Sequence, residues 1–174
     1  MYDIAQGEPE QYFVVNQFGN PLNPEIHYQQ TGPEIWSDTN GHIDIFVAGV
    51  GSGGTLQEIG KFLKEKNSRI KIVAVEPGNS AALLGREPGL HHIQGIGDGF
   101  VPAVLDVNLV DMVFTVSDEE AIETTRRLSS EEGLLVGTSS GANVFAALHM
   151  DNGRNKVVTI LPDRAERYFS TALL

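Results

Sequence analysis

A glycine-rich turn follows an apolar run and precedes a segment with helical spacing, and its residue types suit the binding of an anion. The turn, GVGSGGT, spans residues 49–55. Glycines let backbone N–H groups converge on a small concavity, and Ser52 and Thr55 add hydroxyl donors. A helix that opens at Gly54 would add the partial positive charge of its N-terminus. The turn therefore predicts a binding site for a phosphate monoester.

Two other interpretations of this turn stay open. It is not a P-loop, because no Gly-Lys-Ser/Thr follows, and its glycines only imitate the dinucleotide fingerprint G-x-G-x-x-G. Glu76 lies where such a fingerprint needs its ribose-binding acid, about twenty residues further on. A tight strand-to-helix turn without any ligand would use the same glycines.

A second hydroxyl-rich segment, GTSSG at residues 137–141, stands between a short apolar run and an apolar helix candidate. Its hydroxyls could cap that helix, or they could face a ligand at the carboxyl ends of the strands. The five histidines form no ligand cluster, so we predict no metal site and expect surface or loop roles for them. No G-x-S-x-G elbow supports a serine triad.

The elements that would position these residues alternate between strand and helix. Apolar runs bounded by turn residues predict strands over residues 12–15, 43–50, 70–75, 112–116 and 157–161. Apolar spacing and end signals predict helices over residues 54–66, 117–133 and 141–149, with a weaker one over 24–30. In the second of these helices, Ser117 and Glu120 have the spacing of a capping box, and Gly133 is the stop signal. The pattern predicts an α/β fold: a doubly wound, mostly parallel sheet with helices on both faces.

Composition excludes several classes of protein. The chain has 174 residues, no Cys, and 12 Lys+Arg against 23 Asp+Glu, which gives a net charge of −11. Without cysteine there is no disulfide framework, thiolate zinc site, Fe–S cluster or Cys nucleophile. The negative charge opposes binding to nucleic acid and to anionic membranes. The sequence has no apolar run long enough to cross a bilayer and no signal-peptide pattern, so we expect a cytoplasmic location.

The sequence also resembles a known family, the cysteine synthases (O-acetylserine sulfhydrylases), in their C-terminal portion. The resemblance covers the chain from Tyr12 onward and rests on strings at residues 16–21, 23–27, 31–36, 49–55, 94–97, 137–141 and 166–171. These enzymes depend on pyridoxal phosphate and have the tryptophan-synthase β-like fold. The resemblance implies an N-terminal extension over residues 1–11 and a domain over residues 12–174 that binds the phosphate of the cofactor.

Site roles follow from the resemblance position by position. The residues that match the family's phosphate-binding loop are Gly51, Ser52, Gly53, Gly54 and Thr55. Ser139 matches the serine that hydrogen-bonds the pyridine nitrogen, and a neutral hydroxyl there suits β-elimination over transamination. Gln17 matches a residue near the substrate carboxylate, and Gly97 lies in the loop that approaches the substrate as the site closes.

The same resemblance implies that a catalytic group is missing. In the family, the lysine that forms the Schiff base with the cofactor lies in the N-terminal portion, and this chain has no match for it. The lysines of this chain, which we expect on charged helix faces or at strand starts, are Lys61, Lys64, Lys66, Lys71 and Lys156. We therefore predict no catalytic residue here and expect this truncated counterpart to be inactive on its own.

The family reaction converts O-acetyl-L-serine and sulfide to L-cysteine and acetate. The resemblance implies an O-acetylserine-like substrate once an N-terminal portion is supplied, a homodimer, and serine acetyltransferase as a partner. One alternative is a non-catalytic module that binds the cofactor phosphate or another protein. A more remote alternative is a nicotinamide-dependent dehydrogenase, which rests only on the glycine pattern and Glu76.

Overall fold

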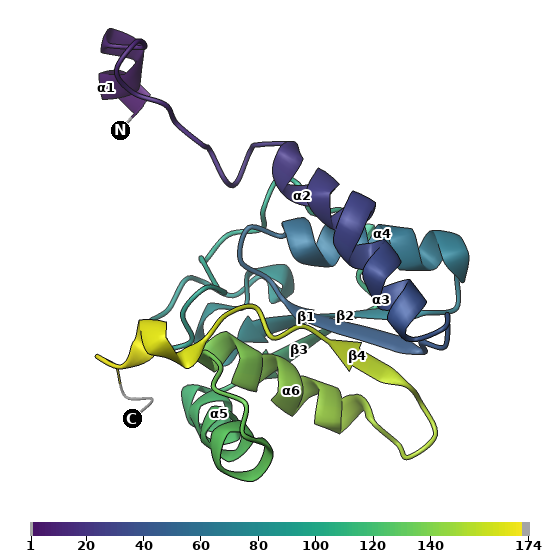
Figure 1. Cartoon of the computed structure of the whole chain (residues 1–174). Coiled ribbons are helices and arrows are strands. Elements are labelled where there is room, and N and C mark those ends of the chain that lie inside the picture. The colour runs from purple at the N-terminus through teal and green to yellow at the C-terminus, as the bar shows by residue number, and fades with distance from the viewer. Residues whose placement is uncertain (1, 172–174) are drawn as a thin grey trace.

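Four parallel strands lie between two layers of helices in the computed structural model, which describes residues 2–171 (Figure 1). The strands are β1 (Ile45–Gly49), β2 (Lys71–Pro77), β3 (Met112–Val116) and β4 (Val157–Thr159). Their order in the sheet is β3-β2-β1-β4, and Ile45 pairs with Lys71 on one side and with Val157 on the other. All carboxyl ends therefore meet at one edge of the sheet, where an open α/β fold binds ligands.

Each face of the sheet packs against its own group of helices. One face carries α4 (Gly54–Lys66) and a continuous helical segment made of α2 (Leu22–Ile26), a π-helical turn (His27–Thr31) and α3 (Gly32–Asp38). The other face carries α5 (Asp118–Glu132) and α6 (Thr138–Met150). Successive residues of β1 serve the two cores, because strand side chains alternate: Phe46 packs in the α4 core and Val47 in the α6 core. The short helix α1 (Tyr2–Gly7) lies apart from this body (Figure 1).

Most of the predicted elements are confirmed, and α5 carries the predicted capping box. The Ser117 hydroxyl accepts from the Glu120 N–H at 3.2 Å, and the Glu120 carboxylate accepts from the Ser117 N–H at 2.8 Å. Gly133 ends the helix in the left-handed conformation, with φ of 70°. The strand predicted over 112–116 and the helix predicted over 54–66 have the observed bounds.

The strand predicted over residues 12–15 is wrong. This segment has no strand structure, and Phe13 is 87% exposed. β-branched and aromatic residues favour a strand through packing and pairing with a neighbour, and within residues 2–171 no strand pairs with this segment. The helix expected over 24–30 is longer than predicted and contains the π-helical turn.

The close approach of α5 and α6 depends on Gly141. A Cβ at this position would lie 2.0 Å from the Thr125 hydroxyl oxygen and 2.2 Å from the Ala121 carbonyl oxygen. The helix expected from residue 141 begins earlier, at Thr138, so that the hydroxyl-rich segment forms its first turn. The packing of Gly141 therefore fixes the position of Ser139, two residues before it.

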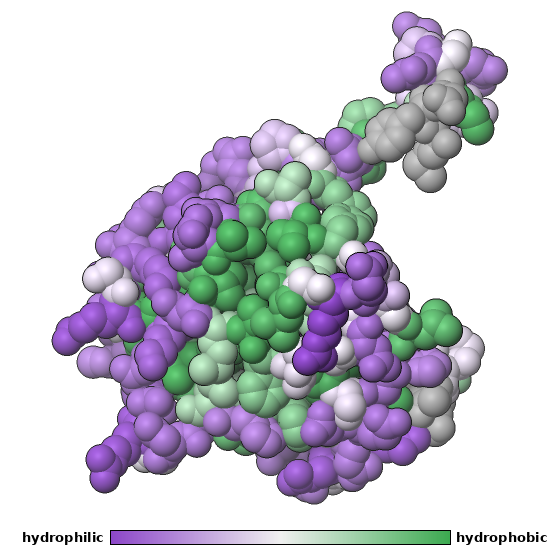
Figure 2. Space-filling view, turned by 180° about the vertical axis from the view of Figure 1, so that it is seen from behind, coloured by the Kyte–Doolittle hydropathy of each residue, from purple (hydrophilic) through white to green (hydrophobic). Residues whose placement is uncertain are grey.

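Figure 2 shows an apolar area enclosed by polar residues on the face opposite the view of Figure 1. Apolar areas on a protein surface are typical of contact with another polypeptide. Within residues 2–171, none of the helices combines the length and the apolar character needed to cross a bilayer.

Candidate functional site

A pocket of about 430 Å³ lies at the carboxyl ends of β1 and β4. Its walls come from the turn after β1, the segment 95–96, the first turns of α6, the segment 160–163 after β4, and the helical segment that begins with α2. A larger hollow of about 590 Å³ lies at the amino ends of the same strands, beside His42 and Lys156. Because open parallel sheets bind ligands at their carboxyl ends, the smaller pocket is the candidate site.

The turn after β1 presents backbone donors to this pocket. Gly53 has φ of 84°, a conformation that favours glycine, and no side chain caps the N-terminus of α4. The first N–H groups of α4 therefore lack partners within the helix and can bind an anion. Gly51 packs closely against the segment that forms the opposite wall, since a Cβ here would lie 2.3 Å from the Gly95 carbonyl oxygen.

Side chains of the α2 segment contact both hydroxyls of the turn. The Asn23 amide donates to the Ser52 hydroxyl at 2.9 Å. Nε2 of His27 lies 3.1 Å from the Thr55 hydroxyl oxygen, and Nδ1 of the same ring lies 3.1 Å from that of Thr31. Burial lowers the pKa of His27, so the ring is neutral at neutral pH and has one donor and one acceptor nitrogen.

Two further residues of the pocket lining, Asn143 and Asp163, carry buried acceptors. Asn143 is 1% exposed, and its amide donates to the Ile160 carbonyl at 2.9 Å while its Oδ1 has no partner among the described residues. Oδ2 of Asp163 accepts from the Tyr168 hydroxyl, and Oδ1 is buried without a partner in the same part of the chain. Burial, followed by the hydrogen bond to Asp163, raises the pKa of Tyr168 to about 12.

Together these groups suit a small compound that carries a phosphate. Donor groups gather at the turn after β1, and the Ser139 hydroxyl lines the same pocket. Its volume lies within the usual range for small-molecule sites.

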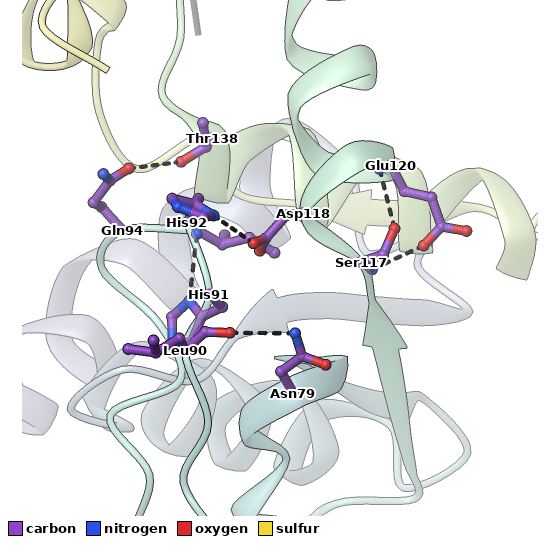
Figure 3. A network of polar contacts seen from close by, with 10 residues as sticks. Asn79, Leu90, His91, His92, Gln94, Ser117, Asp118, Glu120 and Thr138 are labelled. Carbon is purple, nitrogen blue, oxygen red and sulfur yellow. Dashed lines mark hydrogen bonds and ion pairs between the residues drawn. The ribbon is translucent and has the colours of Figure 1, made fainter. Parts of the chain in front are cut away.

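A polar network holds the loop that forms one wall of the pocket (Figure 3). Nδ1 of His92 pairs with the Asp118 carboxylate at 2.8 Å, at the start of α5. The Thr138 hydroxyl, in the first turn of α6, donates to the Gln94 side-chain oxygen at 3.3 Å. These contacts attach the loop to both helices on that face of the sheet, so the wall at residues 95–96 has a fixed position.

The structure brings six of the eight predicted site residues to this pocket. The predicted residues that line it are Gln17, Gly51, Ser52, Gly53, Thr55 and Ser139. Gly54 lies in the first turn of α4 without lining the pocket, and Gly97 lies behind the wall, where its carbonyl accepts from the Ser80 hydroxyl at 3.0 Å. The roles of all eight stay predictions.

Glu76, the acid that the dinucleotide interpretation needs, does not line the pocket. It is 2% exposed, and its carboxylate accepts from the Leu83 N–H at 3.1 Å. Burial raises its pKa, although hydrogen bonds from backbone N–H groups act in the opposite direction.

Sequence reasoning did not select Asn23, His27, Asn143 or Asp163 as site residues. The sequence does contain a signal that could have identified Asn143, because it is the one strongly polar residue between Gly141 and Leu148 in an otherwise apolar helix candidate. His27 had a weaker one, since Asn23 and Thr31 lie four residues on either side of it, on one helical face. Asp163 reaches the site only through the tertiary fold.

No lysine is among the pocket's lining residues, as far as residues 2–171 show. Lys64 pairs with Asp111 at 2.8 Å, and Lys61 lies 3.7 Å from Glu58. Lys66 lies over the ring of Phe62, 5.2 Å from its centroid. These three side chains take part in contacts on α4, as expected for the charged face of a helix.

The chain is similar to several known proteins. A family model described as "Pyridoxal-phosphate dependent enzyme" matches residues 3–163. Cysteine synthase A of Escherichia coli K12 is 51% identical over 183 aligned residues, which cover 98% of this chain and 57% of the relative. Cysteine synthase of Staphylococcus aureus is 48% identical over 170 residues, covering 95% of this chain and 55% of the relative.

A solved structure is also closely similar. The O-acetyl serine sulfhydrylase isoform 3 of Entamoeba histolytica superposes with a TM-score of 0.93 at 42% identity, covering 99% of this chain and 52% of that one. The chain thus spans little more than half the length of the relatives that it matches.

Proposed function

Because the chain belongs to the family of pyridoxal-phosphate-dependent enzymes, we propose that it provides the cofactor-phosphate half of a cysteine synthase-like active site. The observation that carries the proposal is the pocket itself, which joins the donor-rich turn at Ser52 and Thr55 to the hydroxyl of Ser139. The match to cysteine synthases across nearly the whole chain supports the same assignment.

The residues present fit pyridoxal phosphate. The turn at residues 51–55 would hold its phosphate through N–H groups, two hydroxyls and the N-terminus of α4. Ser139 would hold the ring end with a neutral hydroxyl, and Gln17 lies at the pocket where a substrate carboxylate would approach. When bound, the cofactor supplies the electron sink for bond breaking at an amino acid.

The proposed reaction is the replacement of the acetyl group of O-acetyl-L-serine by sulfide, which gives L-cysteine and acetate. The chain's own contribution is to bind and orient the cofactor. No lysine lines the pocket among the described residues, and we propose that the lysine that forms the Schiff base and moves the substrate proton comes from a further polypeptide segment. We propose that the chain alone is inactive, that residues 12–174 form the binding domain, and that two copies associate.

The test combines binding with complementation. Purified chain is titrated with pyridoxal phosphate and with pyridoxal, and the phosphate-bearing compound should bind more tightly. Borohydride reduction of the mixture should modify no single lysine specifically. Adding a separately produced segment that corresponds to the uncovered part of the Escherichia coli relative should then give cysteine from O-acetyl-L-serine and sulfide.

Three outcomes would contradict the proposal. Cysteine formation by the chain alone, with one specifically modified lysine, would show that a catalytic lysine is present here. Binding of a nicotinamide dinucleotide with no response to pyridoxal phosphate would favour a dehydrogenase instead. Cofactor binding that never yields activity with the added segment would favour a non-catalytic binding module.

A further inference from the structure

Two side chains of the α2 segment lie directly behind the hydroxyls of the phosphate-binding turn. Asn23 and His27 are four residues apart, so they occupy one face of the helical segment. Asn23 contacts Ser52, and His27 contacts Thr55. Ser52 and Thr55 both line the pocket. The two contacts are made to their hydroxyl oxygens, so the direction in which each hydroxyl hydrogen points has to be derived from the other partners.

The direction of the Asn23 contact is fixed by its second partner. The amide nitrogen of Asn23 also lies 2.9 Å from the Gln17 carbonyl oxygen, which can only accept a hydrogen bond. The atom that faces Ser52 is therefore an NH₂ donor, and the Ser52 oxygen accepts. The Ser52 hydroxyl hydrogen has no acceptor among the described residues, so it is available to an anion in the pocket.

His27 allows two arrangements. Its ring nitrogens each lie 3.1 Å from a threonine hydroxyl oxygen, that of Thr31 at Nδ1 and that of Thr55 at Nε2. In one arrangement Nε2–H donates to Thr55, Nδ1 accepts from Thr31, and the Thr55 hydrogen turns toward the pocket. In the other, Thr55 donates its hydrogen to the ring and has none to offer an anion.

We propose that Asn23 and His27 are positioning residues for the cofactor phosphate, which direct the hydroxyl hydrogens of Ser52 and Thr55 into the pocket. The inference rests on the proposed function, because the occupant is the phosphate of pyridoxal phosphate. A bound phosphate then selects the Nε2–H form of His27, since only that form lets Thr55 donate. The π-helical turn that begins at His27 brings Thr31 to the other ring nitrogen, in keeping with the frequent use of such turns at functional sites.

The test compares affinities for pyridoxal phosphate and for pyridoxal, which lacks the phosphate. Asn23→Asp keeps the shape of the side chain but makes it an acceptor, so Ser52 should turn its hydrogen away from the pocket. We expect affinity for pyridoxal phosphate to fall by about tenfold or more in Asn23→Asp and in His27→Leu. Affinity for pyridoxal should not change, because the hydroxyls face only the phosphate.

A conservative variant and a matched control separate positioning from folding. His27→Gln keeps an N–H donor for Thr55 and should recover most of the affinity lost in His27→Leu. Gln29→Ala removes an exposed side chain of the same helical segment, which contacts Glu25 at 2.6 Å, and should bind like the parent chain. Thermal unfolding shows whether each variant is folded.

Nitrogen NMR of the histidine rings gives a readout that needs no activity. On addition of pyridoxal phosphate, His27 should show the Nε2–H form. A ring in the complex that carries its proton on Nδ1 and none on Nε2 would overturn the inference, and so would folded variants with unchanged affinity or with equal losses for both compounds. If the parent chain itself does not bind pyridoxal phosphate, the proposed function fails together with the inference. If the parent chain binds it and the folded variants bind it equally well, only the inference about Asn23 and His27 fails.

Discussion

Replacing Gly51 with alanine should remove the phosphate end of the pocket by a purely steric effect. The new Cβ would lie 2.3 Å from the Gly95 carbonyl oxygen, whereas ordinary contacts begin near 3.4 Å. The turn and the facing wall must therefore separate by about 1.1 Å, the difference between these two distances. Gly51 does not have a positive φ, so backbone strain adds nothing to the effect.

This separation is large compared with the tolerance of a hydrogen bond. Charge-assisted hydrogen bonds contribute about 1.5–3 kcal/mol each, and about 1.4 kcal/mol corresponds to a tenfold change in affinity. We expect the affinity of Gly51→Ala for pyridoxal phosphate to fall by about 10- to 100-fold, the effect of losing one such bond. Overpacking should lower the free energy of unfolding by about 1–3 kcal/mol, which leaves the chain folded.

Calorimetric titration with pyridoxal phosphate measures the effect, and thermal unfolding confirms that the variant is folded. Gly78→Ala is the matched control, because its added Cβ would meet only the Val116 carbonyl oxygen at 3.8 Å and its φ is not positive. The control should bind like the parent chain. A folded Gly51→Ala protein with unchanged affinity would refute the argument from close approach.

Four further predictions concern stability and ionic strength. Burial raises the pKa of Glu76, so the folded state binds this proton more tightly than the unfolded state, and the free energy of unfolding should fall as pH rises above about 4.5. Glu76→Gln should lack this fall in denaturant titrations across that range. Tyr168 has a pKa of about 12 against an ordinary value of 10, so stability should fall by about 2–3 kcal/mol between pH 10 and pH 12. Tyr168→Phe should lose this alkaline step, and an unchanged step would refute the assignment to Tyr168. Ser117→Ala removes the capping box of α5 and should cost about 1 kcal/mol in urea unfolding; a neutral effect would count against the cap. Affinity for pyridoxal phosphate should stay constant or rise slightly between low and moderate salt, as measured by calorimetry, and a steep fall would point to a cationic site.

The sequence predicted best those structural features that depend on residues close together in the chain. The turn at 49–55 and the capping box at Ser117 place their functional groups within a few positions, so spacing predicted both features. The segment 12–15 has residues of high strand propensity, but a strand also needs a paired neighbour, and residue types alone do not show one.

The candidate site was only partly accessible to such reasoning. In this site, Asn143 on α6 contacts the Ile160 carbonyl, 17 residues later, and Thr55 contacts His27, 28 residues earlier. Contacts of this kind arise when the sheet brings its carboxyl ends together, and no local pattern encodes them. A lone amide in an apolar helix was the one sequence signal for Asn143.

The proposed phosphate site would let a chain of net charge −11 bind a dianion. No lysine or arginine lines the pocket among the described residues, so attraction in this proposal would come from the N–H groups of the turn, the α4 N-terminus and two directed hydroxyls. These dipoles act only within a few ångströms, because their field falls off faster than that of a charge. The orientation of each donor therefore matters more here than in a site built on lysine or arginine, whose charge attracts phosphate at longer range. In such a site, residues that fix the direction of a hydroxyl, as Asn23 does for Ser52, contribute to affinity without touching the ligand.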